Sequence, residues 1–144
     1  MTFLDTNVFM YAAGADGPYR DPCRRILVAS VRSGLQAATN TEVVQEILYR
    51  YRRTAEASMA VHRARQACAV VAAVLPVEDD DLRRAMEILE RHEAVGVRGA
   101  IHAASALRWR CERIVSTDRG FDLLAAEGVV RADPVAFAAD LPDA

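Results

Sequence analysis

Short segments rich in β-favouring residues alternate along this chain with longer segments of helical pattern, and this alternation constrains the fold most. The β-like segments are Thr2–Leu4, Gln36–Thr39, Val74–Glu78, Arg113–Thr117 and Val129–Ala132. Alternation of this kind favours a parallel sheet with helices on both faces and right-handed crossovers. No repeat or low-complexity linker interrupts the 144 residues. We therefore expect one domain over residues 1-144, an α/β/α sandwich of three layers with a five-stranded parallel sheet.

Local signals place helices between these segments. Asp21 and Gly34 are residue types that start and stop a helix. Thr39 and Glu42 have the spacing of a capping box, which predicts a helix running to about Arg53. Further helices are expected over Ala55–Ala73, from Asp79 with Leu82, Ala85, Met86 and Leu89 facing inward, and over Gly99–Cys111.

Composition excludes several classes of protein. No apolar run reaches the roughly 18 residues needed to span a bilayer, and the first residues do not resemble a signal peptide, so we expect a cytoplasmic protein. The net charge of −2 gives no global basic field for nucleic acid. The absence of lysine excludes a Walker A loop and a Schiff-base enzyme. Three widely spaced cysteines argue against a disulfide framework or zinc ribbon, and we expect each to be buried.

Three carboxylates occupy positions where α/β proteins build sites. Asp5 ends the first predicted strand, Asp118 follows the fourth, and Glu46 lies about two turns into the helix after the second. In a doubly wound sheet, sites form at the carboxyl ends of the strands. If the first and fourth strands are neighbours, Asp5 and Asp118 converge, and Glu46 can reach the same cleft from the side.

Carboxylates that share a cleft repel one another unless a cation lies between them. Ligands that are all oxygen favour Mg²⁺ or Mn²⁺ over zinc. Such an ion can polarise a phosphoryl oxygen and activate water, which is the chemistry of phosphodiester hydrolysis.

Four motifs in this order resemble PIN-domain ribonucleases, and the size and layout are similar to the VapC toxins of bacterial VapBC toxin–antitoxin modules. The motifs are Phe3-Leu4-Asp5-Thr6-Asn7, Glu42-Val43-Val44-Gln45-Glu46-Ile47-Leu48, Ser116-Thr117-Asp118-Arg119-Gly120-Phe121-Asp122 and Ala132-Asp133-Pro134. The resemblance covers nearly the whole chain. It implies strand order 3-2-1-4-5 and a Mg²⁺-dependent endoribonuclease that hydrolyses RNA.

The resemblance also assigns residues and partners. It implies that Asp5, Glu46 and Asp118 are catalytic metal ligands. The residues considered for substrate binding are Thr6, Asn7, Thr117 and Asp122. VapC toxins imply a homodimer and a small antitoxin, which would lay a helix in an apolar groove and send an Arg or Lys toward the carboxylates.

One position departs from the family pattern. Where the family has an Asp at the start of a helix, this chain has Gly99, which offers no side-chain ligand. Glycine in a first helical turn is also less favourable than Ala by up to ~1 kcal/mol. A natural loss and an engineered substitution both explain it. Our hypothesis is that Gly99 weakens metal binding and cleavage.

Structural explanations stand beside the functional ones. Asp5 and Asp118 could cap or form turns, and Glu46 could pair with Arg50 on the helix surface. His102 is expected to be packed rather than to act as a base. The run Asp79-Asp80-Asp81 is expected to be helix-start charge. An Arg-rich, Tyr-containing stretch could bind RNA or be a solvated face or dimer contact: Tyr49, Arg50, Tyr51, Arg52, Arg53, Arg63 and Arg65.

Two other functions are compared with the nuclease. A degenerate PIN domain would bind RNA or protein without cutting, and would stay inactive after Asp is restored at position 99. A receiver-like signalling domain requires an Asp at the end of the third strand and a Lys at the end of the fifth. The third predicted strand ends Val77-Glu78 and lysine is absent, so this alternative ranks low.

Overall fold

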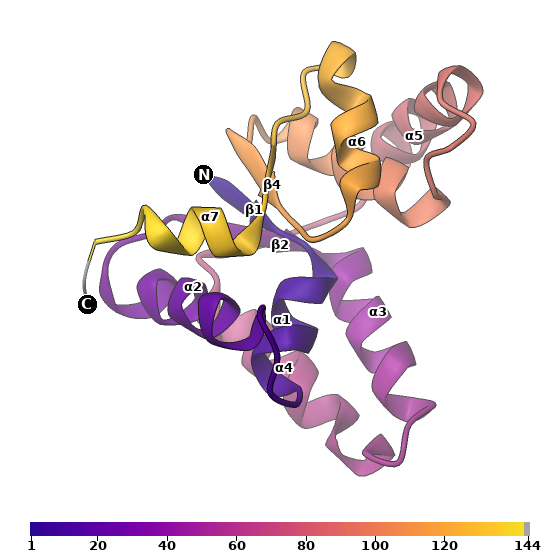
Figure 1. The fold of residues 1–144 in the computed structure, drawn as a ribbon. Coiled ribbons are helices and arrows are strands. Elements are labelled where there is room, and N and C mark those ends of the chain that lie inside the picture. Colours follow the sequence, from indigo (N-terminus) through magenta and orange to yellow (C-terminus); the bar gives the residue numbers. More distant parts are fainter. Residues whose placement is uncertain (143–144) are drawn as a thin grey trace.

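The computed structural model describes residues 1–142, in which five parallel strands form one sheet between layers of helices (Figure 1). The order across the sheet is β3-β2-β1-β4-β5, and each neighbouring pair is parallel. The strands are β1 Thr2–Leu4, β2 Ala37–Asn40, β3 Ala73–Leu75, β4 Arg113–Val115 and β5 Arg131–Ala132. The predicted fold class and strand order are confirmed.

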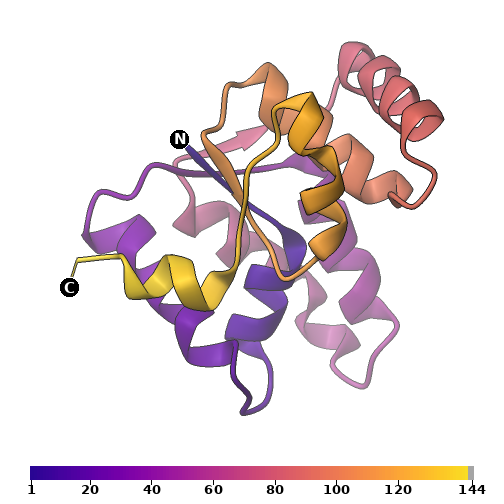
Figure 2. The same cartoon turned by 45° about the horizontal axis from the view of Figure 1, so that its top comes forward.

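Helices cover both faces of this sheet. The α-helices are α1 Thr6–Ala13, α2 Arg20–Arg32, α3 Thr41–Arg52, α4 Ala60–Val70, α5 Asp79–Arg91, α6 Val97–Arg108 and α7 Pro134–Ala139. Two further 3-10 segments are η1 Ala57–Met59 and η2 Arg119–Glu127. Figures 1 and 2 show α5 and α6 on one side, and α1, α2 and α4 on the other.

Two predicted helix starts are corrected. The N-cap of α3 is Asn40, whose side-chain oxygen accepts a hydrogen bond from the Val43 backbone N–H at 2.9 Å. Thr39 instead ends up inside the sheet, donating its hydroxyl to the Leu4 carbonyl at 3.0 Å. Helix α2 begins at Arg20, so Asp21 lies in its first turn and caps nothing. Asn and Thr are both good N-cap residues. Strand β2 extends to Asn40, one residue beyond the predicted end at Thr39, so Asn40 rather than Thr39 caps helix α3.

The predicted long helix Ala55–Ala73 is interrupted. It divides into η1 and α4, and its last residue belongs to β3. The predicted strand Val74–Glu78 therefore begins one residue earlier and ends at Leu75, because Pro76 follows and Glu78 already caps α5. Alanine-rich sequence gives no local signal for such a break.

Helix α5 begins at Asp79 as predicted, and its predicted inward face is confirmed for Ala85 and Leu89 but not for Leu82 and Met86. Glu78 and Asp81 form a capping box at its start. The Asp81 carboxylate is buried and accepts two hydrogen bonds from Arg108 of α6, at 2.8 and 2.9 Å. Leu82 and Met86, expected to face inward, are 43% and 57% exposed, whereas Ala85 is buried and Leu89 packs against the core. The buried face of α5 therefore includes the acidic residue Asp81 beside Ala85 and Ile88.

The strand order sets the location of the site. Because β1 and β4 are neighbouring parallel strands, their carboxyl ends meet at one edge of the sheet. Asp5 follows β1 directly, and Asp118 lies three residues beyond β4. Both strands are almost fully buried, so the residues that follow them are held by a packed core.

The fold can be compared with the expectations for membrane-spanning segments and for the burial of the cysteines. Within residues 1–142, no helix combines the length and apolarity needed to cross a bilayer. Cys23 is buried and Cys111 is half-buried, but Cys68 is exposed on α4, so the expectation of three buried thiols is wrong for Cys68.

Candidate active site

A cavity of about 510 Å³ opens at the carboxyl ends of the central strands. All three predicted carboxylates, Asp5, Glu46 and Asp118, line it, and so does Gly99. They come from the end of β1, the middle of α3, the start of η2 and the first turn of α6. Residues separated by more than a hundred positions in sequence are therefore brought to one pocket, as the strand pattern predicts.

Asp5 is buried and held by three donors. As the N-cap of α1 its Oδ1 accepts the Thr6 backbone N–H at 2.7 Å. Its Oδ2 accepts the Asn7 side-chain amide at 2.8 Å and the Ser116 hydroxyl at 2.6 Å. Burial nevertheless raises the pKa of Asp5, although His102 and these hydrogen bonds act in the opposite direction. A buried carboxylate at this position favours a cation in the adjacent cavity.

Glu46 lies beside Asp5 and is linked to it through one residue. Its Oε2 accepts the Thr6 hydroxyl at 2.7 Å, while the Thr6 backbone N–H is bound to Asp5. Its Oε1 pairs with Arg50 at 2.6 Å and with Arg98 at 3.4 Å. Burial opposes ionisation of Glu46, but His102, Thr6 and Arg50 outweigh it and lower the pKa of Glu46 to about 2. Glu46 is therefore ionised at neutral pH.

Asp118 combines a structural contact with a place in the cavity. It is the N-cap of η2, and its Oδ1 accepts the Gly120 backbone N–H at 2.8 Å. Its own backbone N–H is bound by the Ser116 hydroxyl at 2.9 Å, which also contacts Asp5. Capping and lining the cavity are thus compatible, since the carboxylate keeps a second oxygen.

Nothing in the fold requires glycine at position 99. Gly99 is the third residue of α6, two residues inside the start that the sequence predicts, so the predicted helix Gly99–Cys111 is corrected. A Cβ placed there would meet its nearest neighbours, Val95 and Phe121, at 3.9 and 4.0 Å, which are ordinary contacts. Gly99 is not among the glycines of positive φ. A side chain at this position would therefore be accommodated at the cavity edge.

His102 was expected to be packed rather than functional, and the structure confirms the packing but also brings it to the site. It is packed, as expected, with 2% of its surface exposed, but its Nε2 faces the two carboxylates. This nitrogen lies 3.5 Å from Glu46 Oε2 and 3.8 Å from Asp5 Oδ1. Its spacing of three residues from position 99 on one helix face was the available signal.

The other polar candidates divide into two groups. Thr6 and Asn7 orient the carboxylates, and Asn7 also accepts the Thr117 backbone N–H at 3.2 Å. Thr117 lines the cavity. Asp122 does not line the cavity. Its carboxylate instead accepts a hydrogen bond from the Arg131 side chain at 2.9 Å.

The predicted cationic stretch reaches the cavity only in part. Arg50 lines the cavity, and Arg98, which the sequence analysis did not include, joins it there. Tyr49 carries Arg53 over its ring at 5.1 Å and Arg98 at 5.6 Å.

The donors fit a hydrated Mg²⁺ better than a closed metal cage. Across residues 1–142, no three His, Cys, Asp or Glu side chains are grouped closely enough to enclose an ion. Mg²⁺ keeps several waters and is commonly bound by one or two carboxylates. Asp5 and Glu46 supply such a pair beside an open cavity that Asp118 also lines. The chemistry of these residues therefore fits a hydrated Mg²⁺ or Mn²⁺.

Comparisons with known proteins show the family and the fold of this chain. The family model for the PIN domain matches residues 2–127. Ribonuclease VapC13 of Mycobacterium tuberculosis is 35% identical over 123 residues, which cover 85% of this chain and 93% of that protein. Among solved structures, M. tuberculosis VapC20, a toxin that cleaves the sarcin-ricin loop, superposes with a TM-score of 0.71 at 20% identity, covering 90% of this chain and 97% of its own. A toxin–antitoxin complex from Klebsiella pneumoniae superposes with a TM-score of 0.65 at 14% identity, covering 93% and 98%.

Proposed function

This chain belongs to the PIN-domain family, among the VapC ribonuclease toxins, and we propose that it is a Mg²⁺-dependent endoribonuclease whose activity is reduced by Gly99. The observation that carries the proposal is the convergence of Asp5, Glu46 and Asp118 on one cavity. The substrate is an RNA phosphodiester, hydrolysed by water without a covalent enzyme intermediate.

Each residue has a distinct part in this proposal. Asp5 and Glu46 would hold the ion, and Asp118, which lines the same cavity, would add a third carboxylate. A bound Mg²⁺ supplies a Lewis acid for the phosphate and lowers the pKa of a water. Thr6 fixes the positions of Asp5 and Glu46 relative to each other, because its backbone N–H binds Asp5 and its hydroxyl binds Glu46. Asn7 and Ser116 fix the second oxygen of Asp5.

The substrate-facing residues are proposed from their places in the cavity. Thr117 lines it, and a threonine hydroxyl there could donate to an RNA phosphate. Thr6 and Asn7 act on RNA indirectly, because their side chains are bound to carboxylates. For Asp122 we propose only a contact with RNA outside the cavity, because its carboxylate is bound by Arg131.

Gly99 is proposed to be the cause of reduced activity. An Asp at this third helical position would add a carboxylate at the cavity edge and would favour the positive end of α6. The space around a Cβ at position 99 supports this proposal, since neither packing nor backbone conformation demands glycine.

The test is single-turnover cleavage of RNA by the unsubstituted chain and by Gly99→Asp in Mg²⁺. We expect Gly99→Asp to cut about 100-fold faster, because one more charged ligand contributes several kcal/mol to the transition state. Gly99→Asn is the matched control of equal size without charge, and should gain far less. Adding Asp5→Asn to Gly99→Asp should abolish the gain, and so should EDTA. Equal rates for the unsubstituted chain and Gly99→Asp would contradict the proposed role of Gly99.

A degenerate, non-cutting PIN domain is the second candidate. The observation favouring it is that Arg50 and Arg98 already neutralise Glu46, which leaves less charge to attract a metal. In that case Gly99→Asp would still not cut RNA in Mg²⁺ or Mn²⁺, although the unsubstituted chain would bind RNA in a gel-shift assay.

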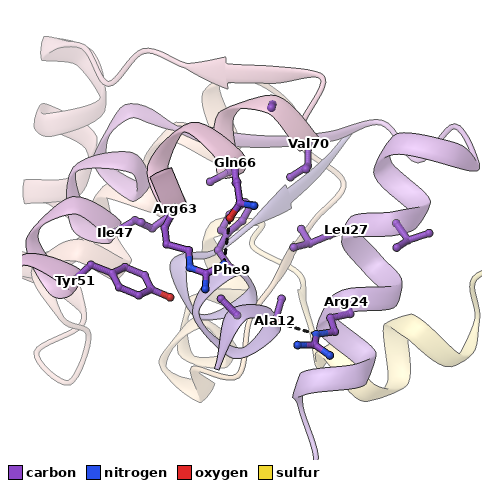
Figure 3. Close-up of a pocket in the computed structure, with 13 residues that line it drawn as sticks. Phe9, Ala12, Arg24, Leu27, Ile47, Tyr51, Arg63, Gln66 and Val70 are labelled. Carbon is purple, nitrogen blue, oxygen red and sulfur yellow. Dashed lines mark hydrogen bonds between the residues drawn. The ribbon is translucent and has the colours of Figure 1, made fainter. Parts of the chain in front are cut away.

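A second, apolar pocket supports the proposal of an antitoxin partner. It measures about 430 Å³ and is lined from α1, α2, α3 and α4, with Phe9, Leu27 and Val70 among its apolar residues (Figure 3). Arg24 and Arg63 also line it, and no described Asp or Glu does. We propose that an amphipathic antitoxin helix with acidic residues beside its apolar face occupies this pocket.

The partner proposal is tested with the product of a short reading frame adjacent to this gene. Ala13→Trp fills the pocket from α1, and Ala136→Trp on the exposed face of α7 is its control. We expect Ala13→Trp alone to weaken binding in calorimetry by more than tenfold. Equal antitoxin affinities of the Ala13→Trp and Ala136→Trp variants would show that the antitoxin binds elsewhere. Sedimentation of the free protein tests the homodimer that we also propose.

A further inference from the structure

The buried imidazole of His102 has one nitrogen bound and the other without a partner. Its Nδ1 lies 3.2 Å from the side-chain nitrogen of Asn40, and the Phe3 ring lies 5.8 Å from its ring centroid. Its Nε2 is buried and makes no hydrogen bond, although it lies between Glu46 and Asp5 at 3.5 and 3.8 Å. A buried unsatisfied nitrogen beside two carboxylates requires an explanation.

Asn40 determines which nitrogen of His102 carries the proton. The Asn40 side-chain oxygen accepts the Val43 backbone N–H at 2.9 Å as the N-cap of α3, so the amide cannot be turned around. Its NH₂ group must therefore face His102 and donate to Nδ1. A nitrogen that accepts a hydrogen bond carries no proton, so in the neutral ring the proton is on Nε2.

We infer that His102 is a positioning residue whose Nε2–H, fixed by Asn40, is directed between Asp5 and Glu46 and fixes the positions of their carboxylates. This inference rests on the proposed function. It also excludes His102 as a metal ligand, because Nε2 carries a proton and Nδ1 accepts from Asn40. The N-cap of α3 and the carboxylates are thereby connected through one ring.

The first experiment examines the metal-free, unsubstituted protein by ¹⁵N NMR at about pH 8. The ring nitrogens of His102, assigned against His62 and His92, should show a protonated Nε2 and an unprotonated Nδ1. Asn40→Asp keeps the cap of α3 but can only accept from the ring, so Nδ1 should become protonated. A protonated Nδ1 in the unsubstituted protein would overturn the inference.

The second experiment tests positioning by comparing two substitutions of His102. Gln can place an N–H near the position of Nε2, whereas Leu cannot. The ¹³C carboxylate resonances of Asp5 and Glu46 should move in His102→Leu and stay close to their original values in His102→Gln. If these resonances move equally in both variants, or move in neither, the positioning role is contradicted even if the tautomer is correct.

A third measurement connects His102 to the proposed function. In the Gly99→Asp background, His102→Leu should weaken Mn²⁺ binding by about 10- to 100-fold, the range seen for residues that orient metal ligands, and His102→Gln should recover most of it. Equal affinities of the Leu and Gln variants would contradict the inference. If Gly99→Asp binds no Mn²⁺, the proposed function fails, and the two NMR experiments on the metal-free protein still decide the role of His102.

Discussion

Thr6 contacts both buried carboxylates of the candidate site, Asp5 through its backbone and Glu46 through its hydroxyl. The resemblance to PIN domains gives Thr6 a part beside Asp5, but its contact with Glu46 depends on the packing of α1 against α3 and is not readable from the sequence. The hydroxyl also helps to lower the pKa of Glu46 to about 2. At the scale of single residues, the site is thus a network in which neutral donors hold Asp5, and the Thr6 hydroxyl together with Arg50 and Arg98 holds Glu46.

Removal of the Thr6 hydroxyl should therefore reduce stability in a way that depends on pH. Thr6→Val is expected to cost about 1.5–3 kcal/mol in the free energy of unfolding at pH 7, the range for a hydrogen bond to a charged group. Because the folded pKa of Glu46 lies below the ordinary value of 4.5, this stabilisation is present above pH 4.5 and is lost as pH falls toward 2. Urea unfolding at several pH values measures it.

Thr6→Ser is the matched control, since it keeps the hydroxyl. It should stay close to the unsubstituted protein across the same pH range. A cost of Thr6→Val that does not change between pH 7 and pH 3 would show that lost packing, rather than the bond to Glu46, causes the effect.

Several residues of the site could be predicted from the sequence, and others could not. Asp5 and Asp118 were found because strand ends mark sites in parallel sheets. His102 and Ser116 were not assigned functions, because their contacts depend on side-chain direction across neighbouring elements. Arg98 was not predicted to lie at the site, because helix α6 was expected to begin at Gly99 and in fact begins at Val97, which places Arg98 in its first turn.

Helix α6 ends without the residue that usually ends a helix. Arg110 adopts φ of +53°, and the Cys111 and Arg110 backbone N–H groups bind the Ala106 and Leu107 carbonyls at 2.9 and 3.0 Å. This is the Schellman arrangement, in which glycine is the common residue at the left-handed position. The predicted end at Cys111 was wrong for this reason, since no glycine marked the true end at Arg108.

Arg110→Gly is accordingly expected to stabilise the protein. A left-handed conformation costs a residue with a Cβ roughly 1 kcal/mol, which glycine avoids, and the greater freedom of glycine in the unfolded chain offsets part of the gain. We expect an increase of about 0.5 kcal/mol in the free energy of unfolding, measured by urea denaturation. Arg110→Ala is the control, because it removes the side chain but keeps the Cβ. Equal stabilities of the two variants would contradict the assignment of strain to this residue.

At the scale of the whole molecule, the sequence predicted architecture better than boundaries. Five alternating β-like segments were enough to predict the sheet, because each is a short run between helical segments, and the central strands β1 and β2 are fully buried. The inward face of α5 was predicted correctly at Ala85 and Leu89 but not at Leu82 and Met86. The burial of Asp81 was not predicted, because its partner Arg108 lies on another helix. Long-range ion pairs of this kind leave no periodic signal.

Metal binding should be visible as stabilisation of the whole fold. For Gly99→Asp at a Mn²⁺ concentration of 100 times the dissociation constant, linkage predicts about 2.7 kcal/mol of added stability. For a protein of this size, that corresponds to a rise in Tm of roughly 5–10 °C. Thermal unfolding followed by circular dichroism with and without EDTA measures the shift. Adding Asp5→Asn to Gly99→Asp should remove it, and an equal rise in that double variant would indicate binding elsewhere.

The location of a bound ion is the most direct test of the account. Crystals of the unsubstituted protein soaked in Mn²⁺ and measured for anomalous scattering should contain a peak between Asp5 and Glu46, in the cavity that Asp118 and position 99 border. A peak coordinated by these carboxylates is the predicted result. Mn²⁺ bound only at other carboxylates of the molecule, with this cavity free of anomalous density, would contradict the metal-dependent nuclease.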